Sequence, residues 1–372
     1  MKSVRSTILL AQSIKSRTMR NSLRFSRKVL LMLICCTLLL ILTFFSVVDI
    51  KKRMLRTREA IVCYRIKTND TLPDISEVTP RRGKSIFFHE TSCYSYFKGR
   101  ISITARQACA VESAARFNPN FEIYLLYSSP GMIKFDGDES DKILQNLLTY
   151  PNVYIMHLDY EKYTKGTPVE RLYASGRIEG SMHAISHSSD VLRYLTMWKY
   201  GGVYLDLDVV MLKSVEDLRN FAAIESEEVV ASGALGFDPS GDAHDMVEKC
   251  LNDLNDNFNG EIWGYNGPGV ITRLLRNLCG TNKTDEMSVN DCGGFHVLET
   301  ESFYPISWRT WWMYFDEKFA DNVTYSTQHA YAIHVWNKLS SERLIPIQSN
   351  APYLDIARKH CPKTVQACDN YF

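Results

Sequence analysis

The chain has 372 residues, of which 45% are hydrophobic and 23% charged, a composition that suits one large globular domain beside an N-terminal extension. Its formal charge of +1 is unevenly spread. Residues 1–28 hold eight basic and no acidic side chains, which leaves −7 on the other 344 residues. This mildly acidic remainder excludes the basic footprint of a nucleic-acid-binding domain.

An apolar run follows the basic N-terminus. Residues 29–48 (VLLMLICCTLLLILTFFSVV) contain no charge, and a helix of that length spans about 30 Å, the hydrocarbon core of a bilayer. A cleaved secretory signal would have a shorter apolar region and a small-residue cleavage site, and a mitochondrial transit peptide would lack the full-length run. The pattern therefore predicts a tail over 1–28 and one uncleaved transmembrane signal anchor over 29–48.

The orientation of this anchor depends on features beyond it, because basic residues flank it equally on both sides. Three acceptor sites for N-glycosylation, Asn69, Asn282 and Asn322, follow the anchor, as do eight of the ten cysteines. An even cysteine count suits disulfides in an oxidising compartment, although the pairing cannot be read from the sequence. We expect a cytosolic tail, a polar stem over 49–82 and a luminal catalytic body over 83–372.

From residue 85 the pattern alternates between strand and helix. Apolar runs predict strands over 85–90, 121–127 and 153–159, separated by helices over 101–117 and near 140–149. This alternation favours parallel strands joined by right-handed crossovers, and hence an α/β layered domain. No G-x-G-x-x-G sequence follows the first strand, which disfavours a dinucleotide-binding dehydrogenase.

The stretch 188–210 (SSDVLRYLTMWKYGGVYLDLDVV) is the most informative part of the chain. Its apolar spacing predicts a helix capped by Ser188 or Ser189. The pair Gly201 and Gly202 ends this helix and permits a tight turn into the following strand.

Two aspartates lie on that strand. Over 203–209 apolar residues alternate with Tyr204, Asp206 and Asp208, so a period of two places these three on one face. Carboxylates this close repel each other at the end of a buried strand unless they share a cation, and Mn²⁺ or Mg²⁺ suits oxygen ligands. The same letters also begin aspartate-nucleophile phosphatases, which ordinarily carry Thr where this chain has Val210.

The second half of the chain changes character. Residues 242–258 predict an amphipathic helix, and Pro268 suits the first turn of another. After residue 292 the sequence is rich in Trp, Tyr and Pro, which suggests irregular structure around a pocket.

Several of these segments carry a family resemblance. YLTMWKYGGVYLDLD (194–208) resembles the metal-binding segment of glycosyltransferases with a DXD motif. The body is similar to the α1,4-glycosyltransferase family in five further stretches: FFHETS (87–92), VESAARFNP (111–119), NGEIWGYNGPGVITRLL (259–275), ESFYPISW (301–308) and YAIHVWNK (331–338). The resemblance implies a GT-A type, Rossmann-like nucleotide-sugar domain after the transmembrane helix, with a nucleotide-sugar half over about 83–215 and an acceptor half over about 216–372.

The resemblance also implies roles for single residues. Asp206 and Asp208 would bind a divalent metal, Mn²⁺ in the first instance, with His334 completing the site; a buried core histidine is the alternative. Asp190, Arg193 and Asp208 form the implied catalytic group, the first two binding hydroxyls of the donor sugar. A helix-surface ion pair is the alternative for Asp190 and Arg193.

Further positions are implied to contact a UDP-sugar: Phe88, Thr91, Tyr204, Asn266 and Trp336. Trp308, Trp311 and Trp312 either form an acceptor platform or fill the C-terminal core. His89 stands where the resemblance leads us to expect an apolar residue.

These features imply a retaining glycosyltransferase of the Golgi membrane, single-pass and type II, with a luminal body. FYPISW and HVWNK are closer to the glycolipid-acting branch of the family. We therefore expect transfer from UDP-Gal or UDP-GalNAc, in α1,4-linkage, to the terminal β-Gal or β-GalNAc of a glycosphingolipid. The sequence identifies no nucleophile, and we expect same-face attack. Three alternatives stay open: an α1,4-N-acetylglucosaminyltransferase acting on O-glycans, a metal-dependent luminal phosphatase, and a non-catalytic glycan-binding relative.

Overall fold

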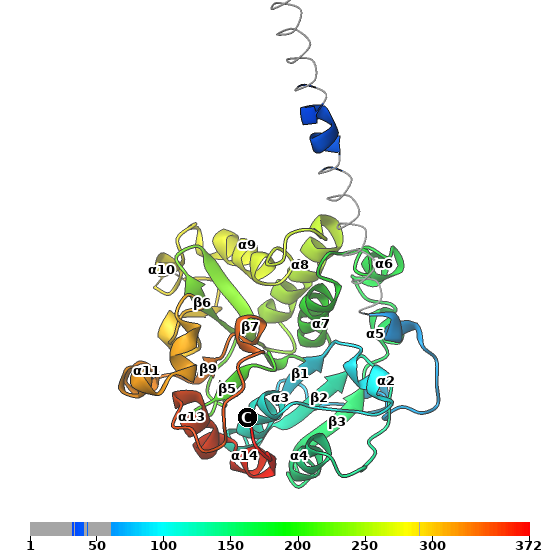
Figure 1. Ribbon diagram of the computed structural model, residues 1–372. Coiled ribbons are helices and arrows are strands. Elements are labelled where there is room, and N and C mark those ends of the chain that lie inside the picture. The colour runs from blue at the N-terminus through cyan, green and yellow to red at the C-terminus, as the bar shows by residue number, and fades with distance from the viewer. Residues whose placement is uncertain (1–31, 33, 41–42, 44–60, 290) are drawn as a thin grey trace, which may run out of the picture. The chain divides into compact units, whose positions relative to one another are not determined.

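The computed structural model describes residues 32, 34–40, 43, 61–289 and 291–372 (Figure 1). Its contacts divide the chain into two units, Met1–Arg56 and Thr57–Phe372. The described residues of the first unit are helical. Within the described part of the chain, no helix is both long and apolar enough to span a bilayer. The predicted tail, most of the predicted anchor over 29–48 and residues 49–60 of the stem lie outside the described residues.

A seven-stranded mixed sheet runs through the second unit in the order β3-β2-β1-β4-β7-β6-β8. Its parallel part consists of β1 (Ser85–Glu90), β2 (Glu122–Tyr127), β3 (Val153–His157) and β4 (Gly202–Leu205). The first three strands confirm the predictions. Antiparallel to β4 lies β7 (Val229–Phe237), followed by β6 (Phe221–Ser226), while β8 (His296–Leu298) pairs parallel with β6. One sheet therefore continues through both predicted halves of the body.

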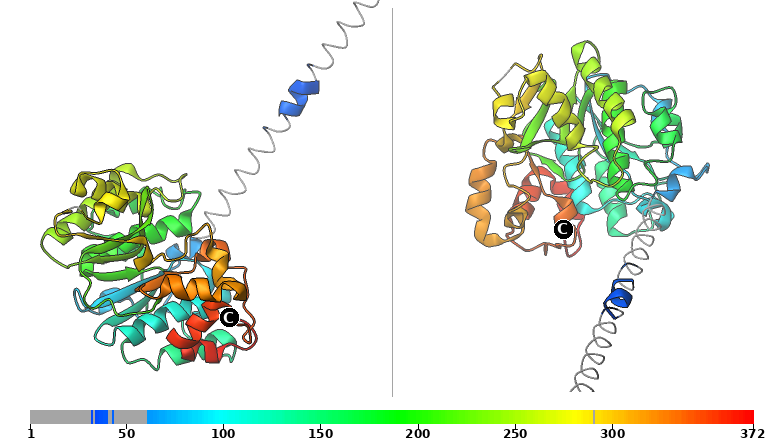
Figure 2. Two further views of the ribbon diagram at one scale, coloured as in Figure 1. Left: turned by 90° about the vertical axis from the view of Figure 1, so that its left-hand side faces the viewer. Right: turned by 90° about the horizontal axis from the view of Figure 1, so that it is seen from above.

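Helices cover both faces of this sheet (Figures 1 and 2). Alternate residues of β1 belong to different cores, since Ile86 and Phe88 face one and Phe87 the other. The first core includes α3 (Ala105–Phe117), α4 (Glu139–Leu147), α13 (Pro352–His360) and α14 (Pro362–Ala367). The second includes α7 (Ala184–Tyr200), α8 (Asp242–Asn257) and α9 (Pro268–Cys279). Burial on both faces explains the continuous apolar runs of these strands.

Two helices begin away from their predicted positions. α3 starts at Ala105 rather than at 101, because Thr104 and Gln107 form a capping box. α7 starts at Ala184, so Ser188 and Ser189 lie inside it and the expectation that one of them caps the helix is wrong. The two helices expected over 242–258 and from Pro268 are confirmed as α8 and α9.

The strand predicted over 203–209 is wrong as a single element. β4 ends at Leu205, and a turn follows in which Val209 N–H donates to the Asp206 carbonyl. β5 (Val209–Met211) then leaves the main sheet and pairs antiparallel with β9 (Ala332–His334). The two aspartates therefore flank a turn instead of sharing one strand face, and Val209 is in register with His334.

Residues 61–82, expected as part of the stem, are folded against the body instead. A disulfide between Cys63 and Cys93 ties η1 (Val62–Arg65) to the start of α2 (Tyr94–Lys98), and Ile75 of η2 (Ile75–Glu77) is fully buried. The folded body thus begins by residue 61 and not at residue 83.

Two further disulfides join Cys109 to Cys361 and Cys279 to Cys292, while Cys250 and Cys368 are buried thiols. The three predicted glycosylation asparagines, Asn69, Asn282 and Asn322, are all exposed.

The region after residue 292 is irregular, as expected. The remaining elements are short: α5 (Tyr160–Thr164), α6 (Glu170–Ala174), α10 (Thr284–Met287), η3 (Thr300–Ser302), η4 (Trp311–Phe315), η5 (Glu317–Phe319), α11 (Ala320–Thr327) and α12 (Asn337–Ser340).

Candidate active site

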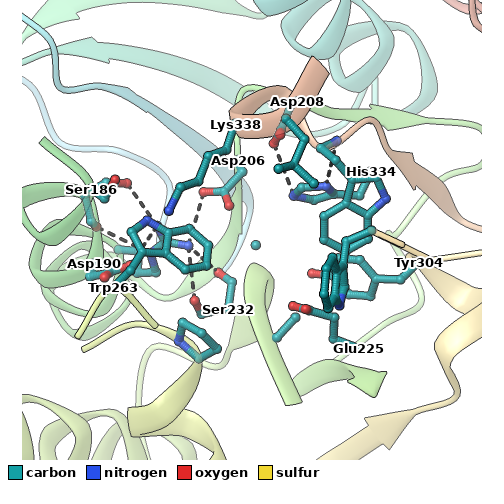
Figure 3. Close-up of a pocket in the computed structure, with 18 of the residues that line it drawn as sticks. Ser186, Asp190, Asp206, Asp208, Glu225, Ser232, Trp263, Tyr304, His334 and Lys338 are labelled. Atoms are coloured by element: carbon teal, nitrogen blue, oxygen red, sulfur yellow. Dashed lines mark hydrogen bonds and ion pairs between the residues drawn. The ribbon is translucent and has the colours of Figure 1, made fainter. Parts of the chain in front are cut away.

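A cavity of about 580 Å³ is lined by side chains from α7, the turn after β4, β7 and the segment from β9 to α12 (Figure 3). Four carboxylates and two basic groups lie in its wall: Asp190, Asp206, Asp208, Glu225, Arg193 and Lys338. This excess of negative charge would repel a diphosphate unless a cation is also bound.

The three predicted metal ligands come together at this cavity. Asp206, Asp208 and His334 each offer one ligand atom, and these atoms lie within 4.8 Å of one another. His334 Nε2 is 3.2 Å from Asp208 Oδ1. Two carboxylates and an imidazole fit a divalent cation such as Mg²⁺ or Mn²⁺, so the residues present suit the implied metal. His334 therefore lines the cavity and is not the enclosed core histidine of the alternative.

Each aspartate has one oxygen held by the protein. Asp206 Oδ1 accepts the Tyr204 hydroxyl at 2.6 Å, and Asp208 Oδ2 accepts the backbone N–H of Asn337 at 2.8 Å. Within the described chain, no hydrogen bond or ion pair reaches Asp206 Oδ2. Burial raises the pKa of Asp208, against the opposing effect of His334. A cation between these groups would offset the cost of burying their charges.

Asp190 and Arg193 form a buried ion pair on α7, and the surface-pair alternative is wrong. Arg193 Nη2 is 3.1 Å from Asp190 Oδ1, and each side chain is only 7% exposed. Arg193 also donates to the Ser232 carbonyl at 2.7 Å and the Ser189 hydroxyl at 3.0 Å. Burial raises the pKa of Asp190 to about 7, although Arg193 opposes this shift.

Arg193 connects this pair to the metal group, because its Nη1 is 3.1 Å from Asp206 Oδ1. The guanidinium also lies over the Tyr204 ring, 4.7 Å from its centroid. Asp190, Arg193 and Asp206 therefore form a row of alternating charges in space. Their two ion pairs fix the geometry of one side of the cavity.

Two glycines allow the backbone to approach these acids. A Cβ at Gly267, just before α9, would collide with Asp190 Oδ1. A Cβ at Gly233 on β7 would lie 3.0 Å from Asp206 Oδ2 and 3.1 Å from the Tyr304 hydroxyl oxygen. The chain carries glycine where any side chain would displace these groups.

Of the residues predicted to contact the UDP-sugar, Thr91 and Trp336 line the cavity, and three do not: Phe88, Tyr204 and Asn266. Phe88 is enclosed in the core. Tyr204 lies behind the cavity wall and positions Asp206. The amide of Asn266 exchanges two hydrogen bonds with the backbone of Asn259, so it shapes the loop before α9.

The tryptophans divide in the same way. Trp308 lines the cavity and is 42% exposed, whereas Trp311 packs against the core and Trp312 lies outside the cavity. Trp336 lines the cavity too, with Nε1 donating to the Ile306 carbonyl at 2.8 Å.

His89, found where an apolar residue was expected, is buried outside the cavity lining. Its Nε2 pairs with the Thr196 hydroxyl at 3.1 Å. Burial lowers the pKa of His89 to about 3, with Arg193 adding to the shift, so the imidazole is neutral and serves as a core residue.

Glu225, Tyr304 and Lys338 are among the lining residues that were not singled out from the sequence. Tyr304 and Lys338 lie inside the FYPISW and HVWNK segments, which could have indicated them. The Lys338 ammonium is 3.5 Å from the ring centroid of Trp263, which joins α12 to the loop before α9 (Figure 3). Glu225 lies in none of the segments that carry the family resemblance. The nearby Glu227 and Glu228 are exposed, so the acidic run looks like a surface segment.

Comparison with known proteins extends this picture. The family profile described as the alpha 1,4-glycosyltransferase conserved region matches residues 239–368, and that of the glycosyltransferase sugar-binding region containing DXD motif matches residues 104–227. The lactosylceramide 4-alpha-galactosyltransferase of Mus musculus is 31% identical over 83% of this chain and 82% of its own length. The alpha-1,4-N-acetylglucosaminyltransferase of Homo sapiens is 29% identical over 69% of this chain and 74% of its own. Among solved structures, the glycosyltransferase GlyE of Streptococcus pneumoniae is 12% identical, with a TM-score of 0.39, over 79% of this chain and 65% of that one.

Proposed function

Because the chain belongs to the α1,4-glycosyltransferase family, we propose that it moves galactose or N-acetylgalactosamine from a UDP-sugar to a glycosphingolipid. The acceptor is a terminal β-Gal or β-GalNAc, the linkage is α1,4, and the configuration of the sugar is retained. The observation that carries this proposal is the group formed by Asp206, Asp208 and His334 in the wall of an acidic cavity. Family membership removes the phosphatase and the non-catalytic protein as alternatives.

Different residues of the cavity bind different parts of the donor. Asp206, Asp208 and His334 hold the divalent ion, Mn²⁺ in this proposal, which supplies positive charge for the diphosphate leaving group when bound. Asp190 and Arg193 contact the hydroxyls of the donor sugar, and Thr91 and Trp336 contact the rest of the nucleotide sugar. The domain that carries them is of the GT-A type, and the acceptor attacks from the face that the diphosphate leaves.

The choice of compartment rests on the glycosylation sites and disulfides of the body. We place the protein in the Golgi membrane as a single-pass type II protein, anchored by residues 29–48. Three exposed glycosylation sites and three disulfides favour an oxidising lumen for the body. Anchoring the body in the membrane that holds a lipid-linked acceptor raises the effective concentration of that acceptor.

A transfer screen with the full-length protein in microsomes tests the reaction. UDP-Gal, UDP-GalNAc and UDP-GlcNAc are each offered with lactosylceramide, with a glycolipid ending in β-GalNAc and with a mucin-type O-glycan. We expect Mn²⁺-dependent transfer from UDP-Gal or UDP-GalNAc to a glycolipid, with loss of product in EDTA. Higher activity with UDP-GlcNAc and the O-glycan would replace the proposed substrates with those of the alternative, an α1,4-N-acetylglucosaminyltransferase acting on O-glycans.

Topology requires a separate test. Protease added to sealed microsomes should spare the body and its three glycans, while detergent should expose both to digestion. Digestion of the body in sealed vesicles would overturn the luminal placement without affecting the proposed reaction.

A further inference from the structure

Glu225 lies in the cavity wall without a partner. It comes from β6, and within the described chain no hydrogen bond or ion pair reaches its carboxylate. Figure 3 shows this carboxylate pointing into the open space of the cavity, on the side away from Asp190. Burial raises the pKa of Glu225 above its usual value, while His334 opposes this shift. A carboxylate in such a place is costly unless a ligand completes its hydrogen bonds.

Glu225 lies at an irregularity in the sheet, on the same face of β6 as Phe221 and Ala223. Ile224 pairs with Val230 and Ser226 with Val229, so two steps along β6 correspond to one step along β7. Glu225 is therefore the extra residue of a β-bulge, an irregularity that is common beside active sites. Its neighbours Glu227 and Glu228, by contrast, are exposed.

A second irregularity in the same strand pairing leaves part of β7 open to the cavity. Ala222 pairs with Leu235 but Ile224 pairs with Val230, so residues 231–234 of β7 have no partner on β6. Residues 231–233 line the cavity, and the carbonyls of Ser232 and Gly233 accept hydrogen bonds from Arg193 and from the Asp206 backbone. The two irregularities thus lie beside the cavity, one at its unpaired acid and the other along residues 231–233 of its wall.

A second unpaired group faces the same space. Tyr304 is 2% exposed, and its hydroxyl is buried without a hydrogen-bond partner. Its ring is fixed by packing against His334 and Trp336, with centroids 5.4 and 5.7 Å away. Among the described residues the hydroxyls of Tyr314 and Tyr353 are also buried without a partner, but of the three tyrosines only Tyr304 lines the cavity, where a ligand can supply the missing hydrogen bond.

The position of these two groups favours the acceptor over the donor. On the other side of the metal group, Asp190 and Arg193 already satisfy each other and belong to donor binding in the proposed function. Trp308, four residues after Tyr304, lines the same cavity with 42% of its surface exposed. An exposed indole beside a carboxylate and a hydroxyl is a suitable surface for a sugar, whose apolar face stacks while its hydroxyls form hydrogen bonds.

We propose that Glu225 and Tyr304 bind hydroxyls of the acceptor sugar, with Trp308 as its stacking surface, and so determine which acceptor hydroxyl reaches the donor. Glu225 accepts a hydrogen bond from one hydroxyl of the terminal sugar, and Tyr304 donates one. This inference rests on the proposed function, because it assigns the acceptor side of that reaction.

The test compares Glu225→Gln with wild type in the full-length protein. Glutamine keeps the shape and loses the charge. The donor is UDP-Gal, and the acceptors are octyl β-galactoside and its derivatives that each lack one ring hydroxyl. Glu227→Gln, two residues away and exposed, is the matched control. Donor hydrolysis by water and UDP binding in the presence of Mn²⁺ are measured alongside, because neither requires an acceptor.

We expect Glu225→Gln to lower kcat/KM for the acceptor about 10- to 100-fold, the effect of one hydrogen bond to a charged group. UDP binding and donor hydrolysis should stay within about twofold of wild type. One deoxy acceptor should react equally slowly with wild type and variant, since it lacks the hydroxyl that Glu225 binds. Tyr304→Phe should show the same pattern with a different deoxy acceptor.

Two results would overturn this assignment. Equal loss of donor hydrolysis and of transfer would place Glu225 on the donor, as a nucleophile would be, and unchanged acceptor kinetics would show that it touches no substrate. Failure of the proposed function looks different: wild type would then be inactive with every galactoside. In that case the same variants are compared on the donor and acceptor that the transfer screen identifies. Glu225→Gln should still lower kcat/KM for the acceptor while leaving donor hydrolysis nearly unchanged.

Discussion

The two sides of the cavity differ in whether their charged and polar groups are paired with one another. On the α7 side, Asp190, Arg193 and Asp206 form a continuous chain of ion pairs. On the β6 side, no hydrogen bond or ion pair from the described residues reaches the Glu225 carboxylate, and the buried Tyr304 hydroxyl has no partner among them either. Groups that are already paired hold a geometry, whereas unpaired groups retain their capacity to bind something else. The contrast therefore separates a preorganised side from a side that is completed by its ligand.

The largest effect should follow a change in the metal group between the two sides. Asp208→Asn removes one carboxylate ligand and should lower transfer about 10³-fold, the scale found for losing a group that stabilises developing charge. Folding should be little affected, because the substitution also removes repulsion between two acids. Transfer assays and thermal unfolding check both statements, with exposed Asp217→Asn as control. Activity near that of wild type would contradict a metal role for Asp208.

Stability should distinguish the two sides next. Arg193→Met leaves the buried Asp190 and the partly exposed Asp206 without their counter-charge and should lower the free energy of unfolding by about 3–5 kcal/mol. Tyr304→Phe removes an unsatisfied hydroxyl and should change it by less than about 1 kcal/mol. Urea unfolding of both variants measures the difference. Equal destabilisation would show that the two sides are built alike.

The stability of the α7 side should also depend on pH, because of His187 on that helix. This residue is buried, its Nδ1 pairs with the Ser181 hydroxyl and its Nε2 with the Trp263 carbonyl, and burial lowers its pKa to about 4. Below its unfolded pKa of about 6.5 the unfolded chain binds a proton that the folded chain does not, so the stability that neutral His187 contributes is lost between pH 6.5 and 4.

Replacing His187 isolates this effect. His187→Gln should reduce the pH dependence of the unfolding free energy in that interval by up to about 1.4 kcal/mol per pH unit. Exposed His296→Gln should leave the profile as in wild type. If all three profiles coincide, His187 is not the titrating group.

The smallest expected effect concerns backbone approach to Asp190. Gly267→Ala places a methyl group against Asp190 Oδ1 and should cost about 1–3 kcal/mol of stability, together with part of the activity. Gly264→Ala in the same loop meets only Pro268 Cγ at 3.7 Å and should be tolerated. Thermal unfolding of the pair provides the comparison, and similar unfolding temperatures would refute the role given to Gly267.

The sequence predicted the preorganised side better than the other. Strands β1 and β2 are buried on both faces, so their apolar runs are visible without knowledge of their neighbours. Asp190, Arg193, Asp206, Asp208 and His334 were all placed in the site through motif resemblance, and all line the cavity. Alternation alone, however, could not reveal the turn after Leu205, because a strand and a strand–turn–strand can share the same pattern of apolar residues.

Glu225 shows why the other side was missed. An acid that precedes two exposed glutamates on a hairpin looks like a surface residue. Its side chain lies on the same face of β6 as Phe221 and Ala223, and that face borders the cavity beside residues 231–233 of β7, which have no partner on β6. Register between strands is a tertiary property, so no local pattern in 221–237 contains it.

The pairing of β5 with β9 has a consequence for how the protein is made. Asp206 and Asp208 leave the ribosome more than a hundred residues before His334. The nascent chain therefore carries the two aspartates for much of its synthesis without the strand that supplies their third partner. Only after β9 has emerged can the group of Asp206, Asp208 and His334 come together. A message that terminates before β9 would thus yield a protein that lacks the third member of this group.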